Sequence, residues 1–330
     1  MQEEDQIVRK LLRQYEDTRL LHERERRERK AALYEKYPQF DEIDRRIASE
    51  SIAAATAKLE GKTSDLSALN AALTSLSNEK KALLQKYGYP QDYLELTYTC
   101  PFCQDTGMVG DSRCHCLRQA LTRELSKDSS QLSLLGEQNF STFSYDYYDD
   151  VSPDVQLHMT PLQNIKNVVT EAKRFVQNFD REYRNLLIYG NTGVGKTFLS
   201  NCIADALINS AHHVVYLSAH KLLDVFRANQ SFKPEEESSL LYRYIFDCDL
   251  LIIDDFGTEP ANSFTNSCFY DCLNERLVRE KSVVISTNLS LDQLQENYSE
   301  RIFSRILGNY TLLKLLGKDI RLQKLAQKKN

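Results

Sequence analysis

The stretch GNTGVGKT, residues 190–197, fits the pattern G-x-x-x-x-G-K-[ST] of a loop that binds nucleotide phosphates. An apolar run precedes the loop and a helical pattern follows it, and this order disfavours the alternative of a chance match. The glycines let backbone amides turn towards phosphate oxygens at the positive end of the helix. Lys196 would reach the β- and γ-phosphates of ATP, and the Thr197 hydroxyl would bind Mg²⁺. The predicted nucleotide-binding residues are Gly190, Asn191, Thr192, Gly193, Val194, Gly195, Lys196 and Thr197.

A second apolar run, LLIIDDFG (residues 250–257), ends in two acids. Taken alone, it could be a strand that stops at the solvent, but the phosphate loop upstream favours a role in the reaction. Asp254 is predicted to bind the nucleotide's magnesium through water. Asp255 is predicted to orient or deprotonate the attacking water.

The run HVVYLS (residues 213–218) separates the loop from the acid pair along the chain. The strand that bears the acids is therefore not expected to neighbour the phosphate-loop strand directly. In NTPases built this way a further strand, here SVVIST (residues 282–287), lies between the two and ends in a polar sensor. Asn288, or Thr287 beside it, would contact the γ-phosphate or the water.

Two arginines, Arg301 and Arg305, lie one helical turn apart in SERIFSRILGNY, residues 299–310. Arginines on a charged helix are usually solvated, but in an oligomeric ATPase an arginine here would reach the nucleotide of the neighbouring subunit. An arginine that acts in trans is worth about 10³–10⁵ in rate. Arg321, which follows a short apolar segment in LLGKDIR, is a candidate second sensor of the nucleotide.

Four of the eight cysteines lie within CPFCQDTGMVGDSRCHC, residues 100–116. Two close pairs joined by a Gly-bearing turn suit a tetrahedral Zn²⁺ that is structural, with the predicted ligands Cys100, Cys103, Cys114 and Cys116. His115 could replace a cysteine, although it is expected to point away. Disulfides are disfavoured in a reducing cytoplasm, a redox dithiol would need only one pair, and an iron–sulfur cluster is a minor alternative. Metal binding worth roughly 10–16 kcal/mol would fold so short a segment.

The pattern along the chain predicts four regions. Residues 1–96 are predicted to be helical, and a stripe of apolar side chains at three- and four-residue steps predicts an antiparallel hairpin or short coiled coil. The stripe consists of Leu66, Leu69, Leu73, Leu76, Leu83 and Tyr87, with Lys80 in the slot between the last two leucines. Residues 97–127 form the zinc-binding unit and residues 128–154 a linker. In residues 155–330, apolar runs alternate with helical patterns, which implies an α/β P-loop NTPase core whose parallel sheet is covered by helices.

The composition, with 42% hydrophobic and 27% charged residues, is that of a globular protein with a charged surface. No apolar run approaches the roughly 20 residues that cross a bilayer, and the N-terminus does not resemble a signal peptide. We therefore expect a cytoplasmic protein with no membrane partner. The net charge of -5 argues against a protein that coats nucleic acid over its whole surface, but not against a local basic groove. The remaining cysteines are expected to be ordinary buried side chains: Cys202, Cys248, Cys268 and Cys272.

The order of these elements resembles an AAA+ ATPase, specifically the bacterial replicative helicase loaders of the DnaC/DnaI type. The resemblance covers about Phe140 to Arg321 and is carried by NFSTFSYDYY, GNTGVGKT, LLIIDDFG, VVISTN, ERIFSRI and GKDIR. It implies that Arg305 is an arginine finger and Arg321 the second sensor. It also implies that Phe140 and Phe143 belong to the segment that leads to the adenine pocket. Asp255 departs from the Glu of many AAA+ enzymes, so we expect slow hydrolysis. The sequence ends nine residues after Arg321, and as in the loaders no separate helical lid is expected.

The resemblance implies an ATP-dependent loader that binds the replicative DNA helicase through its N-terminal helices and zinc unit. The loader would help to place the helicase on single-stranded DNA during DNA replication, and its AAA+ domains would self-associate. Two alternatives remain: an IstB-like ATPase that partners a transposase, and a nucleotide-binding zinc/coiled-coil adaptor without turnover. Lys221, Arg227 and Lys233 are candidate DNA contacts, although surface charge on a helix is the simpler account of each.

Overall fold

A computed structural model describes residues 2–59, 63–125, 137–151, 153–155, 157–230 and 236–327. The chain divides into two compact units, one formed by Leu12–Val109 and the other by Met1–Leu11 with Gly110–Asn330. Each unit is described by itself. Of the predicted candidate residues, Lys233 lies outside the described residues, as does the side chain of Leu66.

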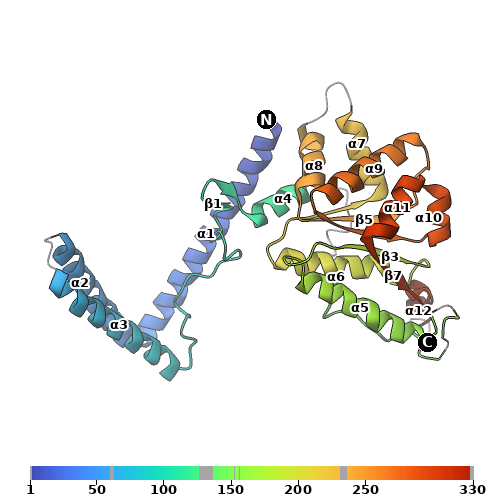
Figure 1. The fold of residues 1–330 in the computed structure, drawn as a ribbon. Coiled ribbons are helices and arrows are strands. Elements are labelled where there is room, and N and C mark those ends of the chain that lie inside the picture. The colour runs from blue at the N-terminus through green and yellow to red at the C-terminus, as the bar shows by residue number, and fades with distance from the viewer. Residues whose placement is uncertain are drawn as a thin grey trace. The chain divides into compact units, whose positions relative to one another are not determined.

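The first unit is largely helical, as the sequence predicts, but the helices end at Lys86, and residues 87–96 of the predicted helical region form turns and irregular backbone. It contains most of α1 (Gln2–Lys36), together with α2 (Gln39–Leu59) and α3 (Thr63–Lys86). The helices α2 and α3 pack against each other as the predicted hairpin (Figure 1). Phe40, Leu33 and Leu84 form the centre of a small core, and tyrosines and leucines from α1, α3 and the segments that follow these two helices pack around them. Aromatic burial thus compensates for the low apolar content of these helices.

The polar residue in the leucine stripe has a structural partner. Lys80 of α3 donates to Asp44 Oδ1 of α2 at 2.5 Å. Lys30 and Tyr34 of α1 donate to Asp44 Oδ2 at 2.8 and 2.6 Å. Burial alone would raise the pKa of the Asp44 carboxyl, but these three hydrogen bonds lower it to about 2. One carboxylate therefore ties three helices together.

The second unit contains a sheet of five parallel strands in the order β4-β5-β6-β3-β7. The strands are β3 (Asn185–Gly190), β4 (Val214–Ser218), β5 (Leu250–Phe256), β6 (Ser282–Thr287) and β7 (Tyr310–Leu315). The helices are α4 (His115–Leu125), α5 (Pro161–Gln177), α6 (Lys196–Asn209), α7 (Ala219–Asn229), α8 (Glu236–Asp247), α9 (Ser263–Val278), α10 (Leu291–Asn297), α11 (Glu300–Asn309) and α12 (Ile320–Gln327). The predicted fold class, a P-loop NTPase core after a helical region and a cysteine-rich segment, is confirmed.

The strand order confirms the predicted insertion, because β6 pairs with β5 on one side and with β3 on the other. The sequence pattern missed β7, which pairs with β3 from Asn185↔Tyr310 to Gly190↔Leu315. This strand lies at the edge of the sheet, and its apolar run is short and interrupted by Lys314. An edge strand need be apolar on one side only, so its pattern was weaker than that of the central strands.

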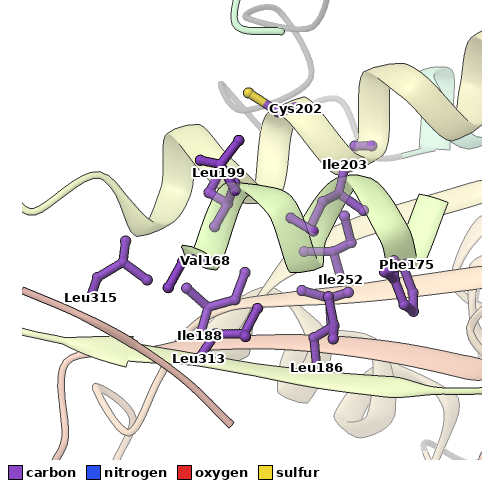
Figure 2. Packing of buried hydrophobic residues seen from close by; sticks show 14 of the residues in the cluster. Val168, Phe175, Leu186, Ile188, Leu199, Cys202, Ile203, Ile252, Leu313 and Leu315 are labelled. Carbon is purple, nitrogen blue, oxygen red and sulfur yellow. The ribbon is translucent and has the colours of Figure 1, made fainter. Parts of the chain in front are cut away.

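Helices cover both faces of the sheet (Figure 1). The helices α5 and α6 lie on one face, where Val168, Phe175 and Leu199 pack over Leu186 and Ile188 of β3 (Figure 2). On the other face lie α7, α8, α9 and α11. Alternate strand residues therefore face opposite helical layers, which explains why the central strands are near-continuous apolar runs.

The helix α4, which follows the cysteine segment, packs on this unit. Gln119 Oε1 accepts a hydrogen bond from the Val214 amide at 3.1 Å, and Thr122 Oγ1 lies 2.6 Å from His213 Nε2. Part of the region expected to be a linker also packs on the core, since Phe143 and Tyr148 are buried there. Among the described residues, no helix is both long and apolar enough to span a bilayer.

Candidate nucleotide site

The predicted phosphate loop joins β3 to the first turn of α6 at the carboxyl edge of the sheet. Gly190 has φ 148°, and a Cβ there would lie 2.3 Å from the carbonyl oxygen of Leu315 on β7. Gly193 has φ 77°, and a Cβ there would lie 2.2 Å from the Asp319 carboxylate. Both positions require glycine because of the backbone conformation and because neighbouring segments approach closely.

Lys196, in the first turn of α6, is only 6% exposed and reaches back over the loop. Its Nζ donates to the carbonyl oxygens of Gly190 at 2.8 Å and Asn191 at 2.7 Å, and to Asn288 Oδ1 at 2.5 Å. Burial lowers the pKa of Lys196 to about 8, although the charges of Asp255 and Asp254 oppose the shift. The ammonium therefore has an incomplete set of counter-charges, which an anionic ligand would complete.

Thr197 and Asp254 lie together beside the loop. The Thr197 Oγ1 is 3.2 Å from Asp254 Oδ2, and Asp254 is 1% exposed. Burial raises the pKa of the Asp254 carboxyl, while hydrogen bonds from Ser286 and other hydroxyls oppose this shift. A hydroxyl and a carboxylate are hard oxygen donors of the kind that Mg²⁺ prefers, so these two residues fit the predicted magnesium site.

A cavity of about 550 Å³ opens over the loop. Of the predicted residues it brings together Thr192, Gly193, Gly195, Lys196, Thr197, Asp255, Asn288 and Arg321. Phe143 also lines it, whereas Phe140 packs against the hydrophobic core beneath. Residues without a predicted role also line the cavity, among them Tyr147 and Lys324. Tyr147 belongs to the aromatic motif NFSTFSYDYY, and Lys324 lies on α12 one turn after Arg321, so helical periodicity was an available signal.

Arg305 does not line the described cavity. It lies on α11, and its guanidinium donates to Asn274 Oδ1 at 2.7 Å and to the Tyr270 hydroxyl at 2.9 Å, both on α9. The guanidinium carbon also lies 4.3 Å from the centre of the Tyr270 ring. Arg301 is exposed on the same helix. These neighbours hold the Arg305 guanidinium against α9, among residues that do not line the cavity.

The four predicted zinc ligands are brought together. Their sulfur atoms all lie within 4.8 Å of one another, in a segment that contains the short strands β1 (Met108–Val109) and β2 (Ser112–Arg113). A tetrahedron with Zn–S bonds of about 2.3 Å has sulfurs roughly 3.8 Å apart, so the arrangement fits the metal. His115 Nδ1 lies 3.3 Å from the Cys114 sulfur, beside the four thiols. The remaining cysteines are buried as expected: Cys202, Cys248, Cys268 and Cys272.

The sequence pattern missed Asp105, which organises the first half of this segment. Its carboxylate is 1% exposed and accepts from the amides of Cys100 at 2.6 Å and Thr99 at 2.9 Å. His22 Nδ1 of α1 lies 3.2 Å from the same carboxylate. The amide of Gly107 donates to the Cys103 sulfur at 3.3 Å, a bond that favours the thiolate.

The phosphate loop, the acid pair two strands away and the inserted strand between them define the fold of a P-loop NTPase core. A family model described as the bacterial DnaA ATPase domain matches residues 163–311. A chromosomal replication initiator protein DnaA from Nautilia profundicola is 30% identical over 119 residues, which is 36% of this chain and 26% of that protein.

The replicative helicase loader DnaC from Escherichia coli is 22% identical over 144 residues, 43% of this chain and 58% of that protein. A crystal structure of DnaI aligns with a TM-score of 0.45 and 19% identity, over 56% of this chain and 94% of that one. The chain thus spans between 26% and 58% of the length of these two curated relatives. The family model and the DnaC match confirm the resemblance to AAA+ ATPases of the DnaC/DnaI type that the motifs indicated.

Proposed function

We propose that this protein is an ATP-dependent loader that binds the replicative DNA helicase and helps to place it on single-stranded DNA. The observation that carries the proposal is the cavity in which Lys196, Asp255 and Arg321 converge on the phosphate loop. The match to the loader DnaC supports the choice of replication over other processes served by AAA+ ATPases.

The side chains in the cavity have distinct roles in this proposal. Bound Mg·ATP supplies a γ-phosphoryl group that is open to attack by water. With this group bound, Lys196 would exchange its bonds to the loop carbonyls for bonds to phosphate oxygens, and Thr197, together with Asp254 through water, would hold the metal. Asp255 orients the water, and Asn288 contacts the water or the γ-phosphate. A carboxylate one methylene shorter than Glu reaches the water less well, so we expect slow hydrolysis.

Arg305 is proposed to act on a neighbouring subunit. Its bonds to Asn274 and Tyr270 hold the guanidinium on the surface formed by α9 and α11, outside its own cavity. Self-association of the ATPase domains would bring this surface to the next nucleotide and stimulate hydrolysis. A lysine in place of Arg305 would keep the charge but lose the planar fork.

The helical region of residues 1–96 is proposed to bind the helicase, and Cys100, Cys103, Cys114 and Cys116 to hold a structural zinc ion. Lys221 and Arg227 on α7 are proposed DNA contacts. Arg227 pairs with Asp224 at 3.0 Å and lies 5.5 Å from the centre of the Phe264 ring, so an arginine and an aromatic ring share this surface. Such pairs suit stacking on single-stranded bases.

The test is a helicase-loading assay on single-stranded DNA with the purified full chain, its cognate helicase and ATP. We expect stimulation of DNA unwinding that is lost in Lys196→Ala and retained in Lys166→Ala, an exposed lysine on α5. A helicase that loads equally well with and without the protein, in either nucleotide state, contradicts the proposal. Recovery of a transposase rather than a helicase as the native partner would favour the IstB-like alternative.

The second candidate function is a nucleotide-binding adaptor without turnover, which the aspartate at position 255 favours. Isothermal titration with ATP and a phosphate-release assay, both with helicase and DNA present, separate the two functions. ATP binding without phosphate release would support the adaptor. Phosphate release that Lys196→Ala abolishes would exclude it.

A further inference from the structure

The two acids of the nucleotide site share one hydroxyl group. Ser286 on β6 is fully buried, and its Oγ donates a hydrogen bond to Asp254 Oδ1. The same Oγ accepts a hydrogen bond from the backbone amide of Asp255 at 3.2 Å. A serine hydroxyl has one proton to donate and lone pairs to accept with, so these two bonds are compatible and fix its orientation.

The hydroxyl lies where β5 is irregular. The pairing of β5 with β6 runs to Ile253↔Ile285 and resumes at Phe256↔Thr287, so β5 has one residue more than β6 between these pairs. Asp255 adopts φ 54°, in the left-handed region. Together these features are a β-bulge at the acid pair, a device that redirects side chains next to functional sites.

The bulge has a consequence for the acids. In a regular strand, consecutive side chains point to opposite faces of the sheet, so Asp254 and Asp255 would point apart. Here Asp254 lies within 3.2 Å of Thr197, and Asp255 lines the same cavity as Lys196 and Thr197. The backbone irregularity therefore turns the second acid towards the side on which the first already lies.

Two hydroxyl groups of β6 form hydrogen bonds with the backbone of the bulge. The Ser286 hydroxyl accepts a hydrogen bond from the Asp255 amide, which the irregular pairing leaves without a backbone partner in the sheet. The Thr287 hydroxyl donates to the carbonyl oxygen of Phe256. A buried amide without a partner costs about 1–3 kcal/mol, and a left-handed aspartate adds further strain. The bulge persists because β6 satisfies its backbone groups.

We propose that Ser286 is a positioning residue for the ATPase reaction. Its hydroxyl fixes the position of the magnesium-binding Asp254 relative to the water-orienting Asp255. The inference rests on the proposed nucleotide chemistry of this site. An alanine at this position removes the donor to Asp254 and leaves the Asp255 amide unpaired. The acids then lose their fixed positions relative to each other, while Lys196 at the end of the phosphate loop keeps its bond to Asn288, the residue after β6.

The experiment compares Ser286→Ala with Ser282→Ala in the full chain. Ser282 is a buried serine at the other end of β6, and its backbone carbonyl rather than its hydroxyl accepts from Arg276. Three quantities are measured: kcat for hydrolysis, the Kd of a fluorescent ATP analogue in EDTA, and the Kd in Mg²⁺. A small misplacement of reacting groups costs up to about 100-fold in rate, so we expect kcat to fall about 10- to 100-fold in Ser286→Ala.

The Kd in EDTA is expected to stay within about twofold of the wild type, and the gain in affinity on adding Mg²⁺ to be reduced. Ser282→Ala should match the wild type in all three quantities, and Ser286→Thr, which restores a hydroxyl, should recover kcat in part. Equal kcat and an equal magnesium gain in Ser286→Ala would overturn the proposal. A weaker affinity for the nucleotide in EDTA together with a lower thermal stability would also overturn the proposal, because this combination indicates a structural role. A wild type that binds no nucleotide would refute the proposed function instead, and a wild type that binds without turnover still tests Ser286 through the magnesium gain.

Discussion

Replacing Gly193 by alanine tests how α12 is attached to the phosphate loop. The amide of Ile320, the first residue of α12, donates to the Gly193 carbonyl at 2.9 Å. The Cβ of an alanine at 193 would lie 2.2 Å from the Asp319 carboxylate, where ordinary contacts begin near 3.4 Å. The substitution must therefore move the loop, the start of α12 or the Asp319 carboxylate, which accepts a hydrogen bond from the Arg321 amide in the first turn of α12. Each of these changes disturbs the start of the helix that carries Arg321 and Lys324 into the cavity.

The expected loss of ATP affinity is the sum of a backbone cost and a hydrogen-bond cost. An alanine at φ 77° costs about 1–2 kcal/mol, which the empty loop can relieve by relaxing but the nucleotide-bound loop cannot. Displacement of α12 breaks the bond from the Ile320 amide, and rotation of the Asp319 carboxylate breaks the bond from the Arg321 amide; either bond is worth about 1 kcal/mol. We expect a total of about 2–3 kcal/mol, or a 30- to 150-fold weaker affinity for ATP.

The assay is a titration of a fluorescent ATP analogue against wild type, Gly193→Ala, Asp319→Ala and the double variant. Asp319→Ala alone removes the hydrogen bond that its Oδ1 accepts from the Arg321 amide at 2.8 Å, and should weaken ATP binding only slightly. In the Gly193→Ala background the same change removes the clash and should restore affinity about fivefold or more. Additive effects within about 0.5 kcal/mol would refute the reasoning, because independent sites give that result.

Three further predictions concern the framework of the site. Burial, and then the charge of Arg118, lower the pKa of His213 to about 4, so the folded chain resists protonation that the unfolded chain accepts near pH 6.5. The free energy of unfolding has its full value above pH 6.5 and falls by about 3 kcal/mol as the pH drops towards 4. In thermal melts between pH 7.5 and 5, the Tm of His213→Gln should depend less steeply on pH than that of the wild type. An unchanged slope would contradict this assignment. Arg276→Met removes the hydrogen bonds to the buried carbonyls of Ile245, Cys248 and Ser282, and should lower the free energy of urea unfolding by about 3–5 kcal/mol. Arg279→Met, at an exposed position, should lower it by less than about 0.5 kcal/mol. Similar losses in the two variants would argue against the buried network. Elemental analysis should find one zinc per chain in the wild type and in Cys248→Ser and none in Cys103→Ser, and zinc-free wild type would reject the metal site.

The sequence predicted the parts of the site that are encoded by short motifs. Lys196 and Thr197 stand at fixed offsets in one loop, and Asp254 ends a run whose four apolar residues require a buried strand. The position of β6 between β5 and β3 followed from the chain order of the runs together with the strand order of known NTPases. In each case a local pattern determined a local structure, and the topology had few alternatives.

The missed features depend on contacts between segments far apart in the chain. The bulge at Asp255 does not alter the hydrophobic pattern of β5, so its partner Ser286 could not be identified from periodicity. Arg276 sits in a helical pattern like any surface arginine, yet it is fully buried and donates to five backbone or sulfur acceptors on other segments. Asp105 likewise has its role only once the chain folds back on Thr99 and Cys100.

The central position of β6 in the sheet has a chemical reason beyond strand order. The strand pairs with β3, which carries the phosphate loop, and with β5, which carries the acids. Residues at its carboxyl end contact both: Ser286 near the end of the strand bonds to Asp254 and the Asp255 amide, and Asn288 directly after the strand accepts from Lys196. A strand in this place can therefore couple the group that binds phosphate to the groups that bind metal and water. Ser286 lies two residues before Asn288, so a change at Asn288 is expected to affect the acids as well. Asn288→Ala combined with Ser286→Ala should therefore lower kcat by less than the product of the single effects.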